Sequence, residues 1–250
     1  MHTASEQIVR QPTRAAADRL PTAFFRWLLL LALAALIACG GADDESPVPP
    51  ASGARTLSIA PIAQQTEVWC WAASAEMVFR HYGLPALNAN YQCGIVAAYF
   101  GGPCAVNCFT CVQAIGPMSQ MHVLINNYGA VVSRVTPSRH LSSALLFSPL
   151  SFDQVAAQIN GNRPIVAGIS PGGYAYPNLS QHIAVIVGYD ATGGGARLIV
   201  NDPFPYAAFP LQPNPYFIAG GTQTRPGQYS VSHAAFVSLM NWANTIHQIQ

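Results

Sequence analysis

The chain has 250 residues, of which 51% are hydrophobic and only 8% are charged. A disordered protein has a high charge and few aromatic residues, so this composition excludes a disordered chain. The formal net charge is +1, and every basic residue is an arginine because the sequence contains no lysine. No cluster of basic residues follows residue 55, which excludes a basic nucleic-acid-binding protein.

The first 38 residues are predicted to be a signal peptide for export. Four arginines precede an uncharged apolar run from Trp27 to Ala38. This run is too short to cross a membrane, which needs about 20 residues. Its length and its position after a basic segment are typical of the apolar region of a secretory signal.

The end of the apolar run, Leu36-Ile37-Ala38-Cys39-Gly40, resembles the lipobox of bacterial lipoproteins. In that family the cysteine becomes the lipidated first residue of the mature protein, so the resemblance implies a lipid on Cys39. Acyl chains bind a bilayer because each buried CH₂ contributes about 0.8 kcal/mol. Gly40 after the cysteine implies, by resemblance to Gram-negative sorting, an anchor in the outer membrane. The expected localisation is therefore export and attachment to the bacterial envelope through this lipid.

The rest of the chain divides into a tether and one domain. Residues 39–56 are rich in proline, glycine and acids without an apolar period, which predicts a flexible tether. Residues 57–250 are predicted to fold as a single domain, because about 190 residues suit one domain with two lobes.

Helical patterns dominate the first half of this domain. Weak alternation over residues 57–63 predicts a short first strand. Residues 70–82 lack proline and glycine, have apolar residues at helical spacing and precede Gly83, so they predict a helix. Further helical patterns cover residues 92–100 and 110–128, and the second is expected to end at Gly129.

Strand patterns dominate the second half. After a helix from an N-cap at Ser151 to about Asn160, apolar runs bounded by turn residues predict strands over residues 164–169, 182–188 and 197–200. A turn at residues 190–195 joins the last two as a hairpin. Residues 203–226 are predicted to be a long loop, and residues 229–250 a helix followed by a strand near Ile246. Helices followed by antiparallel strands predict an α+β fold.

Cys70 is the first candidate for chemistry, because it lies in the predicted first turn of the helix over residues 70–82. Free backbone N–H groups and the helix dipole favour an anion there. They therefore favour the thiolate, which is the nucleophilic form of cysteine. Acyl transfer by a thiolate also needs a base, a group that orients the base, and donors for the oxyanion. Packing within an alanine-rich helix is the alternative role for this residue.

The segment from Gln64 to Ser74 resembles the nucleophile region of papain-like cysteine peptidases. In that family a glutamine stands six residues before the cysteine, and an aromatic residue follows the cysteine. Gln64 and Trp71 have these positions around Cys70. The resemblance implies that the Gln64 side chain and the Cys70 backbone N–H form the oxyanion hole. Gln65 is an equally good donor by its chemistry, and the spacing favours Gln64.

The family's histidine begins an apolar strand that ends in glycine, and His182 has this position. The residue that orients the histidine follows the next strand, where this chain has Asn201-Asp202-Pro203. We select Asp202 because compact branches of the family have an aspartate before a proline, and because a carboxylate stabilises an imidazolium better. Asn201 is the alternative. The resemblance implies that His182 takes the thiol proton, the thiolate attacks a carbonyl, and water cleaves the thioester.

Three departures from papain point to compact bacterial branches, such as the double-glycine leader peptidases and the AvrRpt2-like effectors. Papain has a cysteine where this chain has Glu67, and Asp202-Pro203 replaces its Asn-Ser-Trp. The separation of 112 residues between Cys70 and His182 is shorter than the roughly 130–150 of papain and cathepsins. The implied fold is papain-like. In it, an N-terminal helical lobe carrying the nucleophile packs on a C-terminal antiparallel β lobe.

Four further cysteines, Cys93, Cys104, Cys108 and Cys111, lie within 19 residues. Two disulfides are expected because exported proteins enter an oxidising compartment, and all three pairings remain open. A zinc site is the alternative, although the spacing matches no recognised zinc pattern. We expect no metal and no cofactor.

A serine hydrolase is a competing interpretation, because residues 168–172 match the Gly-x-Ser-x-Gly pattern around Ser170. Asp202 and His233 follow in the order of that family. The pattern requires a helix directly after the serine, whereas proline and glycine follow here, so this interpretation is disfavoured. The loop is instead expected to precede the strand of His182 and to help line the cleft.

The leading hypothesis is a membrane-anchored cysteine peptidase that is monomeric, acts on peptide or protein substrates and does not bind nucleic acid. The alternatives are a non-catalytic binding module of the envelope and a transglutaminase-like acyltransferase, which shares the order Cys, His, Asp. An intact set of Gln64, Cys70, His182 and Asp202 argues against the binding module. The other histidines of the predicted domain are expected to be structural or surface residues: His81, His122, His140, His233 and His247.

Overall fold

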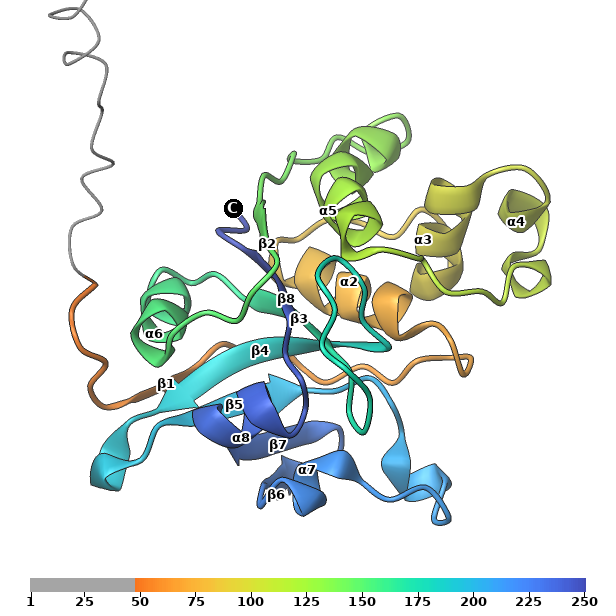
Figure 1. The fold of residues 1–250 in the computed structure, drawn as a ribbon. Coiled ribbons are helices and arrows are strands. Elements are labelled where there is room, and N and C mark those ends of the chain that lie inside the picture. The colour runs from red at the N-terminus through yellow and green to blue at the C-terminus, as the bar shows by residue number, and fades with distance from the viewer. Residues whose placement is uncertain (1–47) are drawn as a thin grey trace, which may run out of the picture. The chain divides into compact units, whose positions relative to one another are not determined.

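The structure is a computed structural model in which residues 48–250 are described (Figure 1). The predicted signal peptide, Cys39 and residues 40–47 of the predicted tether lie outside the described residues. Within residues 48–250, no helix is long and apolar enough to cross a membrane. The predicted tether already joins the fold before residue 57. Strand β1 (Ala54–Thr56) pairs with β4, and the Ala51 N–H donates to Asp153 Oδ1 at 2.7 Å.

The N-terminal half is helical, with α2 (Cys70–His81), α3 (Tyr91–Phe100), α4 (Pro103–Val106), the short 3-10 turn η1 (Cys108–Thr110) and α5 (Met118–Val132). The helices predicted over residues 70–82 and 92–100 are confirmed. The predicted strand over residues 57–63 is wrong, because no strand is formed there and Pro61 has no N–H to donate to a ladder.

The helix predicted over residues 110–128 is wrong at both ends. Residues 111–117 form a loop, and α5 begins only after Pro117. The helix also continues through Gly129 to Val132 instead of ending there. A Cβ at Gly129 would collide with the carbonyl oxygen of Arg139. This glycine therefore allows a close approach of two backbone segments and does not cap the helix.

The β lobe is one antiparallel sheet. Its strands after β1 are β2 (Ala144–Leu146), β3 (Ile165–Ile169), β4 (His182–Asp190), β5 (Arg197–Asn201), β6 (Thr222–Arg225), β7 (Gln228–Ser232) and β8 (Asn244–His247). Their order is β2-β8-β3-β4-β5-β7-β6, and β1 also pairs with β4. The three predicted strands are β3, β4 and β5, which are confirmed. Hydrogen bonds between β4 and β5 confirm the predicted hairpin.

Two predictions in the C-terminal half need correction. The predicted long loop over residues 203–226 contains the 3-10 turn η3 (Tyr206–Ala208), helix α7 (Pro215–Ile218) and edge strand β6. The chain after Tyr229 continues as strand β7 before the short helix α8 (His233–Ser238). Pairing with β5 and β6 on either side determines this strand, and local propensity does not show such pairing. Helix α6 (Phe152–Asn160), with a capping box from Ser151 and Gln154, and the strand at Ile246 are confirmed.

The two lobes meet where α2 packs against β4. Figure 1 shows α2, α3, α4 and α5 gathered on one side of the described part, with the sheet beside them. Helix α2 is buried on all sides from Trp71 to Phe79, and Trp71, Met77 and Phe79 are at most 1% exposed. Burying such side chains stabilises the packing by about 1.5–3 kcal/mol each. The predicted α+β fold, with a helical lobe packed on an antiparallel β lobe, is confirmed.

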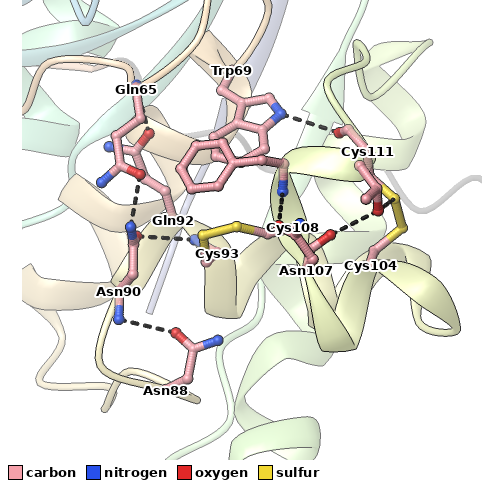
Figure 2. The surroundings of a disulfide bond; sticks show 12 residues. Gln65, Trp69, Asn88, Asn90, Gln92, Cys93, Cys104, Asn107, Cys108 and Cys111 are labelled. Atoms are coloured by element: carbon pink, nitrogen blue, oxygen red, sulfur yellow. Dashed lines mark hydrogen bonds between the residues drawn. A yellow bond between two sulfur atoms is a disulfide. The ribbon is translucent and has the colours of Figure 1, made fainter.

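Two disulfides cross-link the region that runs from α3 to the loop before α5 (Figure 2). Cys93 pairs with Cys108 and Cys104 pairs with Cys111, with Cα–Cα distances of 5.1 and 5.7 Å. The zinc alternative is wrong, because all four sulfur atoms are bonded in pairs. In residues 48–250, no three His, Cys, Asp or Glu side chains gather as a metal site. Disulfides persist in oxidising compartments, so they indicate a domain that works outside the cytoplasm.

Candidate active site

Cys70 is the first residue of α2 and the only free cysteine among the described residues. No side chain caps the helix at Trp69, so backbone N–H groups remain available around the thiol. The tryptophans on either side of Cys70 anchor this helix end. The Trp69 indole N–H donates to the Cys111 carbonyl at 3.3 Å (Figure 2), and that of Trp71 donates to the Gln113 carbonyl at 3.1 Å. The disulfide-bonded segment and the loop after it therefore support the start of α2.

His182 is the first residue of β4, and its imidazole lies close enough to the Cys70 side chain for that side chain to raise its pKa. One turn into α2, the Ser74 hydroxyl donates to the carbonyl of Ile183 at 3.1 Å. This buried bond ties the helix of Cys70 to the strand of His182. The other side of the imidazole faces Asp202, with 2.8 Å between His182 Nε2 and Asp202 Oδ1. Nδ1 is then the ring nitrogen that remains for Cys70.

Asp202 follows β5 directly and is 2% exposed. Besides His182, the Phe204 backbone N–H donates to Oδ1 at 2.8 Å, and the Tyr216 hydroxyl donates to Oδ2 at 2.9 Å. A buried carboxylate needs such donors to offset the loss of water. The three donors therefore hold a buried acceptor against the imidazole.

The Asn201 side chain contacts other groups. Its Nδ2 donates to the Ile59 carbonyl at 2.9 Å, and its Oδ1 accepts from Gln228 Nε2 at 2.8 Å. Successive side chains of an extended chain point to opposite faces, which explains why Asn201 and Asp202 have different neighbours. Asn201 thus links three segments of the β lobe, while Asp202 is the residue that contacts His182.

Gln64 lies in the loop before α2 and is 8% exposed. Its backbone N–H donates to the Pro203 carbonyl at 2.9 Å, and its Nε2 donates to the Thr66 carbonyl at 2.8 Å. A side-chain amide nitrogen has two hydrogens, so one remains for another acceptor. Gln65 is exposed, and its Oε1 accepts a hydrogen bond from Asn90. Of the two glutamines, Gln64 is therefore the one that is buried and also bonded to the segment after Asp202.

The electrostatic environment favours the charged form of His182. Burial lowers the pKa of this imidazole, but the adjacent Asp202 carboxylate and the Cys70 side chain outweigh burial and raise the pKa to about 10. The unfolded chain has the ordinary pKa of about 6.5. The charged imidazole therefore contributes its full stabilisation to the fold below about pH 6.5, and this contribution is lost as the pH rises through about 10. This pKa favours the imidazolium form of His182 at neutral pH.

Burial and the Asp202 charge also raise the pKa of Tyr216 well above its usual value. This phenol therefore stays protonated and keeps donating to Asp202 Oδ2.

A cleft of about 490 Å³ opens beside His182. Pro171 and Gly172 line it, so the prediction that this loop helps to line the cleft is confirmed. A smaller cavity of about 160 Å³ adjoins Gln64, and Glu67 and Phe204 line both. His182 thus lines the larger cavity and Gln64 the smaller one.

The structure does not bring together Ser170, Asp202 and His233, the three residues of the competing serine-hydrolase interpretation. Ser170 is 2% exposed, and its hydroxyl oxygen accepts the Gln181 N–H at 3.3 Å within the loop before β4. Turn residues, and no helix, follow Ser170. His233 Nε2 instead contacts the Leu150 carbonyl at 2.8 Å, and Asp202 is bonded to His182.

The sequence interpretation missed three residues that contact the candidate site. Ser74 lies four residues after Cys70 and thus on the same helix face, so helical spacing would have found it. Tyr216 belongs to a segment predicted as loop, and no local signal connects it with Asp202. Gln92 contacts the Gln64 loop from α3, and only the tertiary structure shows this contact.

A comparison with known proteins shows the family of this chain. The Peptidase_C39 like family matches residues 56–209. A solved structure from a study of the mite allergens Blo t 1 and Der p 1 has 16% identity and a TM-score of 0.49, covering 81% of this chain and 73% of the other. Procathepsin L 3 from the larval midgut of Tenebrio molitor has 13% identity and a TM-score of 0.46, covering 80% and 70%. No curated protein matches. Because the family match spans more than half of the sequence, the chain belongs to the Peptidase_C39 like family and is a cysteine peptidase.

Proposed function

We propose that this peptidase hydrolyses peptide or amide bonds with Cys70 as nucleophile, His182 as acid and base, and Asp202 as the residue that orients His182. The observation that carries the proposal is the position of His182. The only described free thiol, Cys70, acts on the pKa of this imidazole, which also lies 2.8 Å from a buried carboxylate and lines a cleft of about 490 Å³.

The mechanism follows from these contacts. The Cys70 thiolate attacks the substrate carbonyl carbon, and the C=O electron pair moves to the oxygen. The free Gln64 Nε2 hydrogen and the Cys70 backbone N–H stabilise this oxyanion. His182 then donates its proton to the amine as the C–N bond breaks, which leaves a thioester. Water attacks the thioester and gives a proton to His182, and cleavage of the C–S bond releases the acid and restores the thiolate.

Hydrolysis of an unstructured protein is the direct test. We expect the purified protein to cleave reduced, denatured casein, and the Cys70→Ala variant to be inactive because it lacks the nucleophile. Glycinamide is added as a competing amine, and the masses of the new carboxyl-terminal peptides are measured by mass spectrometry. These masses show whether water or the amine accepts the acyl group. Products that carry glycinamide in place of a free acid would favour the acyltransferase. Binding without cleavage, equal in both proteins, would favour the binding module.

We infer that Cys39 anchors the protein in the bacterial envelope, in the outer membrane. The lipobox-like segment supports this inference, and the two disulfides agree with export. Wild-type protein produced in a Gram-negative bacterium is expected to incorporate labelled palmitate and to remain in the membrane fraction after a high-salt wash. Cys39→Ala should lose both properties, whereas Cys70→Ala should keep both. Retention of Cys39→Ala in washed membranes contradicts the anchor.

A further inference from the structure

One buried side chain holds both peptide units that flank Gln64. Gln92 Nε2 donates to the Ala63 carbonyl at 2.9 Å, and Gln92 Oε1 accepts from the Gln65 backbone N–H at 3.0 Å. Gln92 is 2% exposed, so water does not compete for these bonds. Because a single amide binds the chain immediately before and after Gln64, it fixes the backbone from which the Gln64 side chain projects.

The same turn of α3 makes a second contact with this loop. Asn90 Nδ2 donates to Gln65 Oε1 at 2.9 Å, and Asn90 Oδ1 accepts the Cys93 N–H at 3.2 Å (Figure 2). Cys93 is in turn bonded to Cys108. The part of α3 that holds the loop is therefore fixed by a disulfide, which gives Gln92 a rigid base.

We propose that Gln92 is a positioning residue for the oxyanion hole and acts through Gln64. An oxyanion donor must lie about 2.7–3.1 Å from the position that the charged oxygen will take. Small displacements of such a donor cost rate, because the interaction depends on a fixed geometry. The Gln92 amide, which belongs to the helical lobe, fixes the backbone on both sides of Gln64. The Pro203 carbonyl, which belongs to the β lobe, accepts the Gln64 N–H. This inference rests on the role of Gln64 proposed above.

Two reagents separate this role from a general loss of structure. p-Nitrophenyl acetate acylates Cys70 through a tetrahedral oxyanion, with loss of p-nitrophenolate. Iodoacetamide alkylates Cys70 by forming the C–S bond as iodide leaves, without an oxyanion. In Gln92→Met, which keeps the length and burial of the side chain, acylation should fall about 10–100-fold. Alkylation, mapped at Cys70 by mass spectrometry, should change less than about threefold because it depends on the thiolate alone.

A double-mutant cycle shows whether Gln92 acts through Gln64. Gln64→Ala alone should lower acylation about 10²–10³-fold. Adding Gln92→Met to Gln64→Ala should cause no further loss, because the residue being positioned is already absent. Gln92→Glu keeps the acceptor for Gln65 and loses the donor for Ala63, so its acylation rate should lie between the wild type and Gln92→Met. This variant also provides the test if Gln92→Met does not fold.

Gln158→Met is the matched control. Gln158 lies on α6, is 8% exposed, and accepts the Gln248 N–H at 3.0 Å. Its replacement removes a largely buried hydrogen bond outside the site and should leave the ratio of acylation to alkylation unchanged. Equal falls of both rates in Gln92→Met, or a loss that adds to that of Gln64→Ala, would overturn the positioning role. If Gln64→Ala itself acylates normally, the proposed oxyanion donor fails as well. If only Gln92→Met is without effect, this inference alone fails.

Discussion

Replacing His182 by alanine is expected to slow alkylation of Cys70 by iodoacetamide at pH 6 by about 100-fold. In general, an imidazolium beside a thiol favours the thiolate, because the two have opposite charges. A thiol without such a neighbour has an ordinary pKa of about 8.5 and is less than about 1% ionised at pH 6. Hydrolysis should fall further, by about 10²–10⁴-fold, because the proton donor for the leaving amine is also lost. The measurement is a timed labelling reaction with the product mapped at Cys70.

His140→Ala serves as the control for this substitution. His140 is exposed and lies in the segment after α5, so its loss should leave both rates unchanged. Two outcomes would count against the thiolate–imidazolium pair. One is a wild-type Cys70 that reacts no faster than glutathione, and the other is a His182→Ala variant that labels at the wild-type rate. Either would favour the non-catalytic binding module.

Replacing Asp202 by alanine is expected to lower hydrolysis by about 10²-fold or more, because His182 loses both its orientation and its main charge partner. Asp202→Asn should be milder. The asparagine oxygen can accept from His182 and Phe204, while its NH₂ group faces the Tyr216 hydroxyl, which can accept. This variant keeps the geometry and removes the charge, so it isolates the electrostatic part of the effect.

The pH profile shows the charge effect directly. On the alkaline side, hydrolysis by the wild type should fall as the pH rises through about 10. There His182 loses its proton and can no longer protonate the leaving amine. Alkylation should not fall there, because no leaving group has to be protonated when iodide leaves. In Asp202→Asn the decline should move to lower pH, since burial lowers the pKa of His182 and only Cys70 still opposes it.

Asn201→Ala tests the alternative partner in the same assay. This change removes buried hydrogen bonds to Ile59 and Gln228, at a cost of about 1–3 kcal/mol in stability. It should leave the alkaline decline of hydrolysis unchanged. An active Asp202→Ala together with an inactive but folded Asn201→Ala would reverse our assignment.

The sequence by itself determined the features that depend on neighbouring residues. The start of α2 at Cys70 follows from apolar spacing, and β4 and β5 follow from apolar runs between turn residues. These patterns are local, because a helix and a strand have periods of 3.6 and 2 residues. The spacing of Gln64 and Cys70 is local as well. Together they indicated the α+β fold, and the resemblance to papain-like cysteine peptidases named Cys70, His182 and Asp202, which the structure brings together.

Only the tertiary structure decided the questions that depend on pairing between distant segments. The choice between Asn201 and Asp202 as neighbour of His182 depends on which way each side chain points at the end of β5. The disulfide pairing, strand β7 and the contact of Tyr216 with Asp202 depend equally on segments that meet in space. Gln92 reaches the Gln64 loop from another helix. Such contacts leave no periodic trace in the sequence, because their energy comes from burial and hydrogen bonds formed only after the chain has packed.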